Sequence, residues 1–272
     1  MDASTQRVFY YHADACPFGG HFTHPVVKAI PSHGSSSLSS AGGHASSRMG
    51  PFRLDDLASY EGVYSEIFGG VNETNDAWTT LVTSVVEGLN ILEVVTADRI
   101  VSRLSVSYPL EGYNAKVSFV GAQFENLRIA GVPVNPVLNL NLLETPGSRF
   151  PSKPFTEDKC FLDKAIEQSQ VMICAKGAPG WLKARYGWVD SEEERRKKGF
   201  VPCSLVKSVE GTPDGSSYGH VVHVPGFGNV FLGELFVSQG MFQLTMIRTE
   251  MGCAGGGTLG AGGGGANGYP IP

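Results

Sequence analysis

Residues 215–219 are the first stretch whose residue types could carry chemistry. They read Gly-Ser-Ser-Tyr-Gly, which matches the G-x-S-x-G pattern with Ser217 at the nucleophile position, and His220 follows at once. In that pattern the serine stands on a sharp turn between a strand and a helix. Here Thr-Pro-Asp at 212–214 precedes the pentapeptide and the β-prone HVVHV at 220–224 follows it. This context indicates a hairpin turn, so we predict no catalytic role for Ser217.

Two His-x-x-His pairs, His21/His24 and His220/His223, have a spacing that could serve a metal. On a helix such a pair reaches one ion, whereas on a strand positions i and i+3 face opposite sides. Both pairs lie in strand-like sequence. The glycines of residues 226–228 also lack the strand and helix that flank a phosphate-binding loop. We therefore expect no metal site, no cofactor site and no catalytic residue.

Pairs of carboxylates could serve glycoside hydrolysis, in which one protonates the leaving group and the other acts on the opposite face of the sugar. Asp55/Asp56 and Glu87/Glu125 are such candidates, and their separation in space does not follow from their spacing in the chain. Glu87 and Glu125 occupy equivalent positions of a possible repeat. That equivalence favours a structural role for this pair.

The possible repeat is an apolar-polar-apolar triplet at residues 52–54, 89–91 and 127–129, spaced by 37 and 38 residues. Between the second and third copies, residues 100–108 alternate apolar and polar side chains, which is the period of a strand with one buried face. Repeated strand units favour a β-solenoid, with a β-sandwich as the alternative. Either way, the following side chains are predicted to share one core: Leu89, Ile91, Leu104, Leu127 and Ile129.

Three segments of the chain resemble bacterial β-rich proteins called choice-of-anchor P. They are VEGLNILEVVTADRIVSRLS at 86–105, FENLRIAGVPVN at 124–135 and VPGFGNVFLGE at 224–234. In that family a VTAD segment is followed by an LxVNGxPV turn and then by a PGxGxVxLNE segment. The resemblance implies a β-rich protein of unknown biochemical role, and it supplies no catalytic residue. Members carry a leader and a surface-anchoring end, and neither is visible in this chain.

Composition narrows the classes of function. The chain has 272 residues, 35 of them Gly, with 17% charged residues and a net charge of -5. Abundant Gly with few charges favours strands and tight turns over helix bundles. Because no basic stripe is present to neutralise phosphates, nucleic-acid binding is disfavoured.

Export and redox signals are sparse. The first 16 residues lack the charged start and apolar core of a secretory signal, and no stretch of about 18 apolar residues could span a membrane. We expect either a cytoplasmic protein or one exported by a leaderless route. None of the five cysteines forms a C-x-x-C pair, which argues against a zinc ribbon. Disulfides among Cys160, Cys174 and Cys203 remain an open alternative to free thiols.

Changes in composition and hydrophobic pattern divide the chain into four regions. Residues 1–145 read as the β-repeat region, with a turn expected at Cys16–Gly20, and residues 146–211 as a helical insertion. Within the insertion we expect helices at 159–172, 181–186 and 191–198, the last with Ser191 as N-cap. Residues 212–251 read as strands that complete the β-domain. Residues 252–272 form a Gly-rich tail that we expect to be flexible alone, and ordered only by pairing with a strand edge.

The sequence therefore predicts a mainly β, non-catalytic structural or self-assembling protein. We expect a bacterial homo-oligomer or a subunit of a larger assembly, such as a surface layer or fibre, because repeated β-units offer long edges for stacking. One alternative is a carbohydrate-active hydrolase or lyase on a β-fold. Another is a carbohydrate- or protein-binding module. Convergence of acidic and aromatic side chains in one groove would favour the carbohydrate alternatives.

Overall fold

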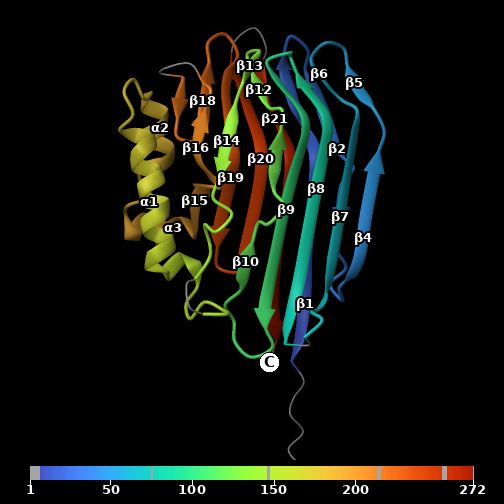
Figure 1. The fold of residues 1–272 in the computed structure, drawn as a ribbon, viewed down its shortest axis with the longest axis vertical. Helices are drawn as coiled ribbons and strands as arrows, with labels where there is room; N and C mark the ends of the chain where they lie inside the picture. The colour runs from blue at the N-terminus through green and yellow to red at the C-terminus, as the bar shows by residue number, and fades with distance from the viewer. Residues whose placement is uncertain (1–6, 75, 146–147, 213–215, 253–255, 272) are drawn as a thin grey trace, which may run out of the picture.

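The computed structural model describes residues 7–74, 76–145, 148–212, 216–252 and 256–271. The chain is mainly β, and every paired strand in these residues runs antiparallel to its neighbours. Two large sheets lie against one another, and a cluster of short helices stands at one side (Figure 1). The helices lie beside the strands β15 and β18 of one sheet.

The nine-stranded sheet has the order β17-β18-β19-β20-β21-β1-β2, with β15 also paired to β19 and β3 to β1. Its strands are β1 (Val8–His24), β2 (Lys28–His33), β3 (Ser36–Ser37), β15 (Phe200–Ser204), β17 (Ser217–Tyr218), β18 (Val221–Val224), β19 (Gly228–Ser238), β20 (Met241–Gly252) and β21 (Gly256–Ile271). Strands from both ends of the chain therefore meet at its centre, where β21 pairs with β1 on one side and β20 on the other.

The ten-stranded sheet is built around the long hairpin of β8 and β9. Its strands are β4 (Gly43–Met49), β5 (Phe52–Leu54), β6 (Ala58–Tyr60), β7 (Gly62–Val71), β8 (Ala77–Ile91), β9 (Val95–Pro109), β10 (Lys116–Ser118), β11 (Gln123–Glu125), β12 (Arg128–Ile129) and β13 (Val132–Pro133). A separate pair is formed by β14 (Asn135–Leu138) and β16 (Val206–Glu210).

The predicted turn at Cys16–Gly20 is wrong, because β1 runs through it as one strand. Pro17 has no N–H to donate, and the ladder to β21 steps from Cys16 to Phe18. On its other side β1 changes partner here, from β3 at Ala15 to β2 at Phe18. Pro17 therefore stands at a position where no ladder hydrogen bond is lost for want of its N–H. The strand continues through this proline because of its partners on both sides, which the local sequence does not reveal.

The predicted shared core is confirmed. Leu89, Ile91, Leu104, Leu127 and Ile129 are all at most 3% exposed and belong to one hydrophobic cluster. The register explains why the triplets look alike: Ile91 pairs with Val95, which also pairs with Ile129, so these side chains lie in one row across the sheet. The triplets at 89–91 and 127–129 therefore look alike because they occupy the same row of the sheet.

The three predicted helices are confirmed as α1 (Lys159–Ile173), α2 (Gly180–Tyr186) and α3 (Glu192–Lys198), and a 3-10 turn η1 (Phe155–Glu157) precedes them. Asp158 caps α1, and the Ser191 hydroxyl accepts a hydrogen bond from the Glu194 N–H at 3.3 Å. Residues 146 and 147, where the insertion was predicted to begin, lie outside the described residues. None of the described helices is long and apolar enough to cross a membrane.

Residues 256–271 are not flexible: they form β21 in the middle of the nine-stranded sheet, ordered by strand pairing, which was the condition that the sequence set for order in this segment. Its inward glycines let the other sheet approach closely. A Cβ on Gly264 would lie 2.8 Å from Val82 Cγ1, and one on Gly262 would lie 3.2 Å from Ile100 Cγ2. The backbone contacts that order this segment come from β1 and β20 of the same chain, so no neighbouring molecule is needed for them.

Aromatic rings fill the space between the sheets nearer the end of β21. Phe9 of β1 stacks on Trp78 of β8 with ring centroids 5.2 Å apart and also contacts Tyr108 of β9. The Tyr108 hydroxyl donates to the Gly240 carbonyl at 3.1 Å, which joins β9 to the β19–β20 turn. The space between the two sheets thus has one part where glycines of β21 allow close approach and another part that is filled by aromatic rings.

Candidate functional site

The most strongly charged buried group of side chains lies where α2 meets β19 and β20. Arg248 of β20 holds Glu234 of β19 through two parallel bonds, Nε to Oε2 at 2.5 Å and Nη2 to Oε1 at 2.8 Å. The Glu234 side chain is only 4% exposed. Glu250 receives a second bond from Arg248 and one from Arg185 of α2 at 2.8 Å. This bidentate geometry is the strong form of an arginine–carboxylate pair.

Phe231 of β19 lies beneath both guanidinium groups of this cluster. The Arg248 guanidinium is 3.8 Å from the ring centroid and that of Arg185 is 4.9 Å away. Phe231 is fully buried and its ring quadrupole attracts both cations, of which Arg248 is mostly buried, with 18% of its side chain exposed, and Arg185 is partly exposed, with 38%. Burial opposes the charged form of Arg248, but the hydrogen bond and charge of Glu234 prevail and raise its pKa.

Tyr186 and His220 complete the cluster on the side of α2. The Tyr186 hydroxyl donates to Glu234 Oε1 at 3.3 Å and lies 3.5 Å from His220 Nε2. Burial, followed by the negative charge of Glu234, raises the pKa of Tyr186. Burial lowers the pKa of His220 to about 4, so this imidazole is neutral near pH 7.

These groups are the types that do acid–base chemistry, but they are closed to solvent. Tyr186, His220 and Glu234 are all buried. Little of their surface is open to a substrate, and the carboxylate of Glu234 is already engaged by a guanidinium and a phenol. The arrangement therefore fastens α2 to the nine-stranded sheet, and its chemistry is that of a satisfied ion-pair network.

A hollow of about 520 Å³ lies between α1 and the β14–β16 pair, with His220 at its wall. Two of its polar side chains, Lys164 and Gln168, are bonded to the backbone of the fold. The Lys164 ammonium donates to the Leu142 carbonyl at 3.2 Å, and the Gln168 amide bonds both the N–H and the C=O of Ser204 at 2.9 Å. This hollow is thus the seam that joins the helices to the β-domain.

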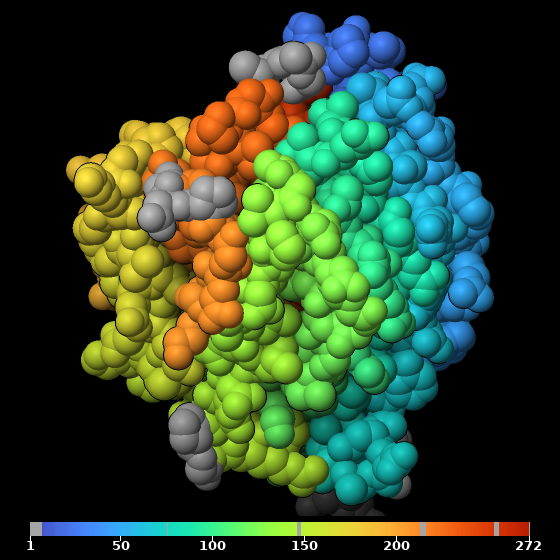
Figure 2. Space-filling view, turned by 45° about the horizontal axis from the view of Figure 1, so that its top comes forward, coloured from blue at the N-terminus to red at the C-terminus, as the bar shows by residue number. Residues whose placement is uncertain are grey.

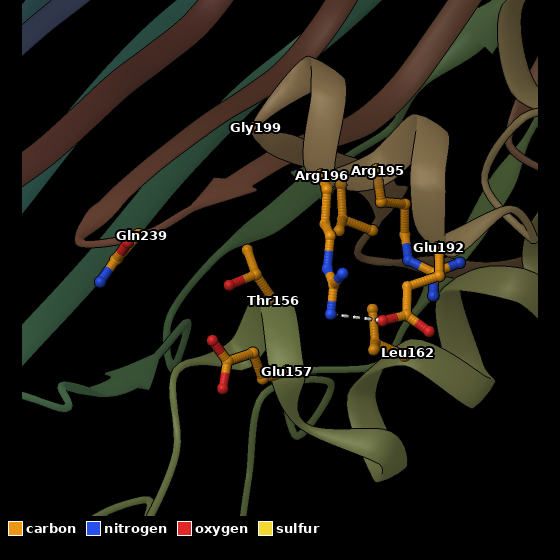
Figure 3. Close-up of a pocket in the computed structure, with 9 residues that line it drawn as sticks. Thr156, Glu157, Leu162, Glu192, Arg195, Arg196, Gly199 and Gln239 are labelled. Atoms are coloured by element: carbon orange, nitrogen blue, oxygen red, sulfur yellow. Dashed lines mark ion pairs between the residues drawn. The ribbon is translucent and has the colours of Figure 1, made fainter.

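A second hollow of about 500 Å³ opens between η1, α1 and α3. Figure 3 shows the Arg196 side chain turned back to Glu192, with Glu157 and Gln239 standing apart from them. The Arg196–Glu192 distance is 2.8 Å, and Arg195 donates to the Val189 carbonyl at 2.5 Å. Arg196 is thus paired within α3, and Arg195 with the turn that precedes this helix, so each guanidinium already has a partner in the fold.

The outer face of the ten-stranded sheet carries a shallow hollow of a different kind. It has a volume of about 430 Å³, and we call it the Tyr64 hollow. It is lined by Ser46, Ser47 and Arg48 of β4, Tyr64, Ser65 and Glu66 of β7, and Glu87 of β8. The Arg48 guanidinium lies over the Tyr64 ring at 5.5 Å. Acidic, basic and aromatic side chains from three neighbouring strands thus converge on one open surface.

A row of charges extends the Tyr64 hollow across β8, β9 and β11. Arg99 of β9 pairs in register with Glu87 on one side and Glu125 on the other. Its guanidinium lies 3.9 Å from Glu87 and 3.5 Å from Glu125, and it donates to the Tyr64 hydroxyl at 3.1 Å. The bond to Tyr64 and the two carboxylates raise the pKa of Arg99 against the opposing effect of burial. The two glutamates picked from the sequence are therefore brought together, with an arginine between them.

The other residues considered from the sequence do not converge. Ser217 lies in the short strand β17, and its hydroxyl donates to the Gly219 carbonyl at 3.2 Å; Gly215 lies outside the described residues. His223 is exposed and bonds Asn229 at 3.0 Å, whereas its pair-mate His220 is buried. His21 and His24 are exposed on β1. Among the described residues no group of three or more potential metal ligands lies together.

The described cysteines are free thiols. Cys160 and Cys174 are exposed on and next to α1, whereas Cys203 is buried in β15. Burial raises the pKa of the Cys203 thiol, so it stays protonated. The alternative of disulfides among these three residues is therefore not adopted, and Cys253 lies outside the described residues.

Sequence reasoning missed Arg48, Tyr64 and Glu66. The signal was present along β7, where Tyr64, Glu66 and Phe68 alternate with the buried Val63 and Ile67. Alternation shows which side chains face outward, but the partner strand decides what lies beside them. Arg48 comes from β4, whose small polar residues gave no such pattern.

Comparison with known proteins places the chain in a family. A family model described as a domain of unknown function (DUF8256) matches residues 9–238, so the chain belongs to that family. The matched residues end before β20 and β21, the two strands that connect β19 to β1 in the nine-stranded sheet. Searches among curated proteins and among solved structures found no match.

Proposed function

We propose that this protein is a non-catalytic binding domain that takes an extended, polyhydroxylated ligand such as a polysaccharide at the Tyr64 hollow. The observation that carries the proposal is the convergence of Arg48, Tyr64, Glu66 and Glu87 on an open sheet face. Carboxylates accept hydrogen bonds from hydroxyl groups, guanidinium and serine groups donate to them, and a tyrosine ring offers an apolar face to C–H groups. All of these are present here.

The shape of the hollow favours a polymer over a small molecule. Sites for small ligands are concave and enclose most of the ligand surface. The Tyr64 hollow is shallow, and the charged row of Glu87, Arg99 and Glu125 continues it along the sheet. A ligand that lies across several strands would contact both parts. The net charge of -5 speaks against a polyanionic ligand such as a nucleic acid.

The alternative of a hydrolase or lyase is less well supported. Two-carboxylate hydrolysis needs one carboxyl group to protonate the leaving group while the other acts on the sugar. Glu87 and Glu125 instead share a single guanidinium, with Arg99 between them. Glu66 is paired with His44 at 3.0 Å. Charges arranged in this way suit binding better than proton transfer.

The arrangement of the two large sheets is also part of this proposal. We infer that the two large sheets form a β-sandwich and not a β-solenoid, which is supported by their antiparallel pairing and by the contacts of Phe9 with Trp78 and Tyr108. We also propose a structural role in a larger assembly. We further propose kinship with choice-of-anchor P proteins, on the resemblance of residues 86–105, 124–135 and 224–234.

The test is affinity electrophoresis of the protein through gels that contain single soluble polysaccharides. We expect at least one polysaccharide to retard the wild type. Tyr64→Ala is expected to lose at least tenfold in affinity, because it removes both the aromatic ring and the hydroxyl that accepts a hydrogen bond from Arg99. Tyr113→Ala is the matched control, since Tyr113 is 64% exposed elsewhere on the surface. Migration unaffected by every polysaccharide, equal loss in both variants, or release of new reducing ends would contradict the proposal.

A further inference from the structure

Strand β4 (Gly43–Met49) is an open margin of the ten-stranded sheet. It pairs with β7 alone in the part of the chain that the structure describes. Figure 1 shows it at the right-hand margin, on the side opposite the helices, and the same part of the chain lines the right-hand margin in Figure 2. The far side of β4 thus presents backbone N–H and C=O groups to solvent, and such an edge is a template for another strand.

The other described strands at sheet margins are protected by the usual devices. Proline interrupts β2, β13, β14 and β15, at Pro31, Pro133, Pro136 and Pro202. The strands β3, β5, β10, β11, β12 and β17 have three residues or fewer, and the five residues of β16 include Lys207. Proline, short length and lysine all discourage edge pairing. With seven residues, no proline and no lysine, β4 lacks all three.

We infer that β4 pairs antiparallel with β4 of a second copy of this chain, about a two-fold axis at Ser46. In this register Ser46 meets its own equivalent, Ala45 meets Ser47, and His44 meets Arg48. The central residues are small, so the backbones can approach to the ordinary spacing of strands. The side chains of His44 and Arg48 stand away from the axis and already have partners, Glu66 for His44 at 3.0 Å and the Tyr64 ring for Arg48 at 5.5 Å.

A second copy fits this edge better than a foreign peptide. Peptides that add to a sheet edge gain specificity from pockets for their alternate side chains. Beside β4 the neighbouring strand presents Tyr64 and Glu66, which are engaged by residues of β4 itself. A two-fold pair needs no such pockets, because the same patch is used on both sides.

The dimer does not rest on the proposed ligand, but it would extend the ligand surface. Ser46, Ser47 and Arg48 of β4 line the Tyr64 hollow. Pairing of two β4 strands would bring two such hollows side by side on one continuous sheet. Self-association would then follow from this edge, whereas the glycine strand β21 is already paired on both sides.

The test is a charge exchange at Ser46, an exposed position on the outer face of β4. Sedimentation velocity at tens of micromolar is expected to give the wild type a mass of twice 29.0 kDa. Ser46→Lys and Ser46→Glu each place like charges directly opposite one another and are expected to be monomeric. An equimolar mixture of the two variants is expected to recover the dimer, because Lys then faces Glu.

Ser208→Lys, on the exposed edge strand β16, is the matched control and is expected to remain dimeric. Thermal unfolding of each variant verifies that the fold is retained. A wild type that is monomeric up to about millimolar concentration overturns the inference. So does a dimer that persists in both Ser46 variants, or a mixture of them that stays monomeric.

Discussion

At the scale of single residues, His220 stands out because the fold removes a titratable group from water. Burial lowers the pKa of its imidazole to about 4, from 6.5 in an exposed histidine. Between pH 6.5 and about pH 4, His220 is protonated in the unfolded chain but stays neutral in the folded chain. The free energy of unfolding therefore decreases as the pH falls from about 6.5 to about 4, and it is unaffected above that window.

Lowering the pKa from 6.5 to about 4 corresponds to about 3 kcal/mol for His220 alone. We expect the difference in unfolding free energy between wild type and His220→Gln to change by this amount between pH 7 and pH 4, in favour of the variant at low pH. Urea denaturation at several pH values measures it. Parallel pH profiles for the two proteins would show that His220 is not the buried neutral group described here.

At the scale of elements, the glycine-rich strand β21 explains how the two sheets approach each other. Gly264 and Gly265 are adjacent on the strand and face opposite sides. A Cβ at Gly264 would lie 2.8 Å from Val82 Cγ1 of the other sheet, whereas the nearest atom to a Cβ at Gly265 is Asp14 Oδ1 at 3.4 Å. Adjacent residues of one strand thus provide a test of inter-sheet packing.

We expect Gly264→Ala to lower the free energy of unfolding by about 1–3 kcal/mol, because Val82 must shift to make room. Gly265→Ala is expected to be neutral or to stabilise by up to about 1 kcal/mol, since alanine reduces the entropy of the unfolded chain. Chemical denaturation of the two variants checks both values. Equal effects at the two positions would mean that sheet contact does not require glycine at Gly264.

At the scale of the whole molecule, the two ends of the chain complete one sheet. Strand β21 pairs with β20 along residues 256–267 and with β1 along residues 256–271. Deletion of residues 253–272 would leave β1 and β20 without a common neighbour and expose the inner face of β8 and β9. We expect the truncated chain to be unfolded or aggregated, as seen by loss of a cooperative thermal transition. A cooperatively folded truncated monomer would contradict the central role of β21.

Local patterns in the sequence determined much of the secondary structure. Alternation along residues 100–108 and the apolar triplets identified buried strand faces, because side chains on a strand take turns between its two sides. The caps at Ser191 and the apolar stripe with Phe161 and Ala165 identified the helices, because helix ends and faces depend on residues three and four apart. The hairpin that contains Ser217 likewise followed from its neighbours in sequence, and Ser217 pairs with Val222.

Tertiary structure alone decided which strands lie side by side, and with them the candidate site. Pairing of β4 with β7 brings Arg48 to Tyr64, and pairing of β9 with β8 and β11 puts Arg99 between Glu87 and Glu125. The glycine-rich end looked flexible because glycine offers no side chain to pack, yet two neighbouring strands supply the backbone hydrogen bonds that hold it. Those partners are over 200 residues away for β1, a separation at which no local sequence pattern carries information.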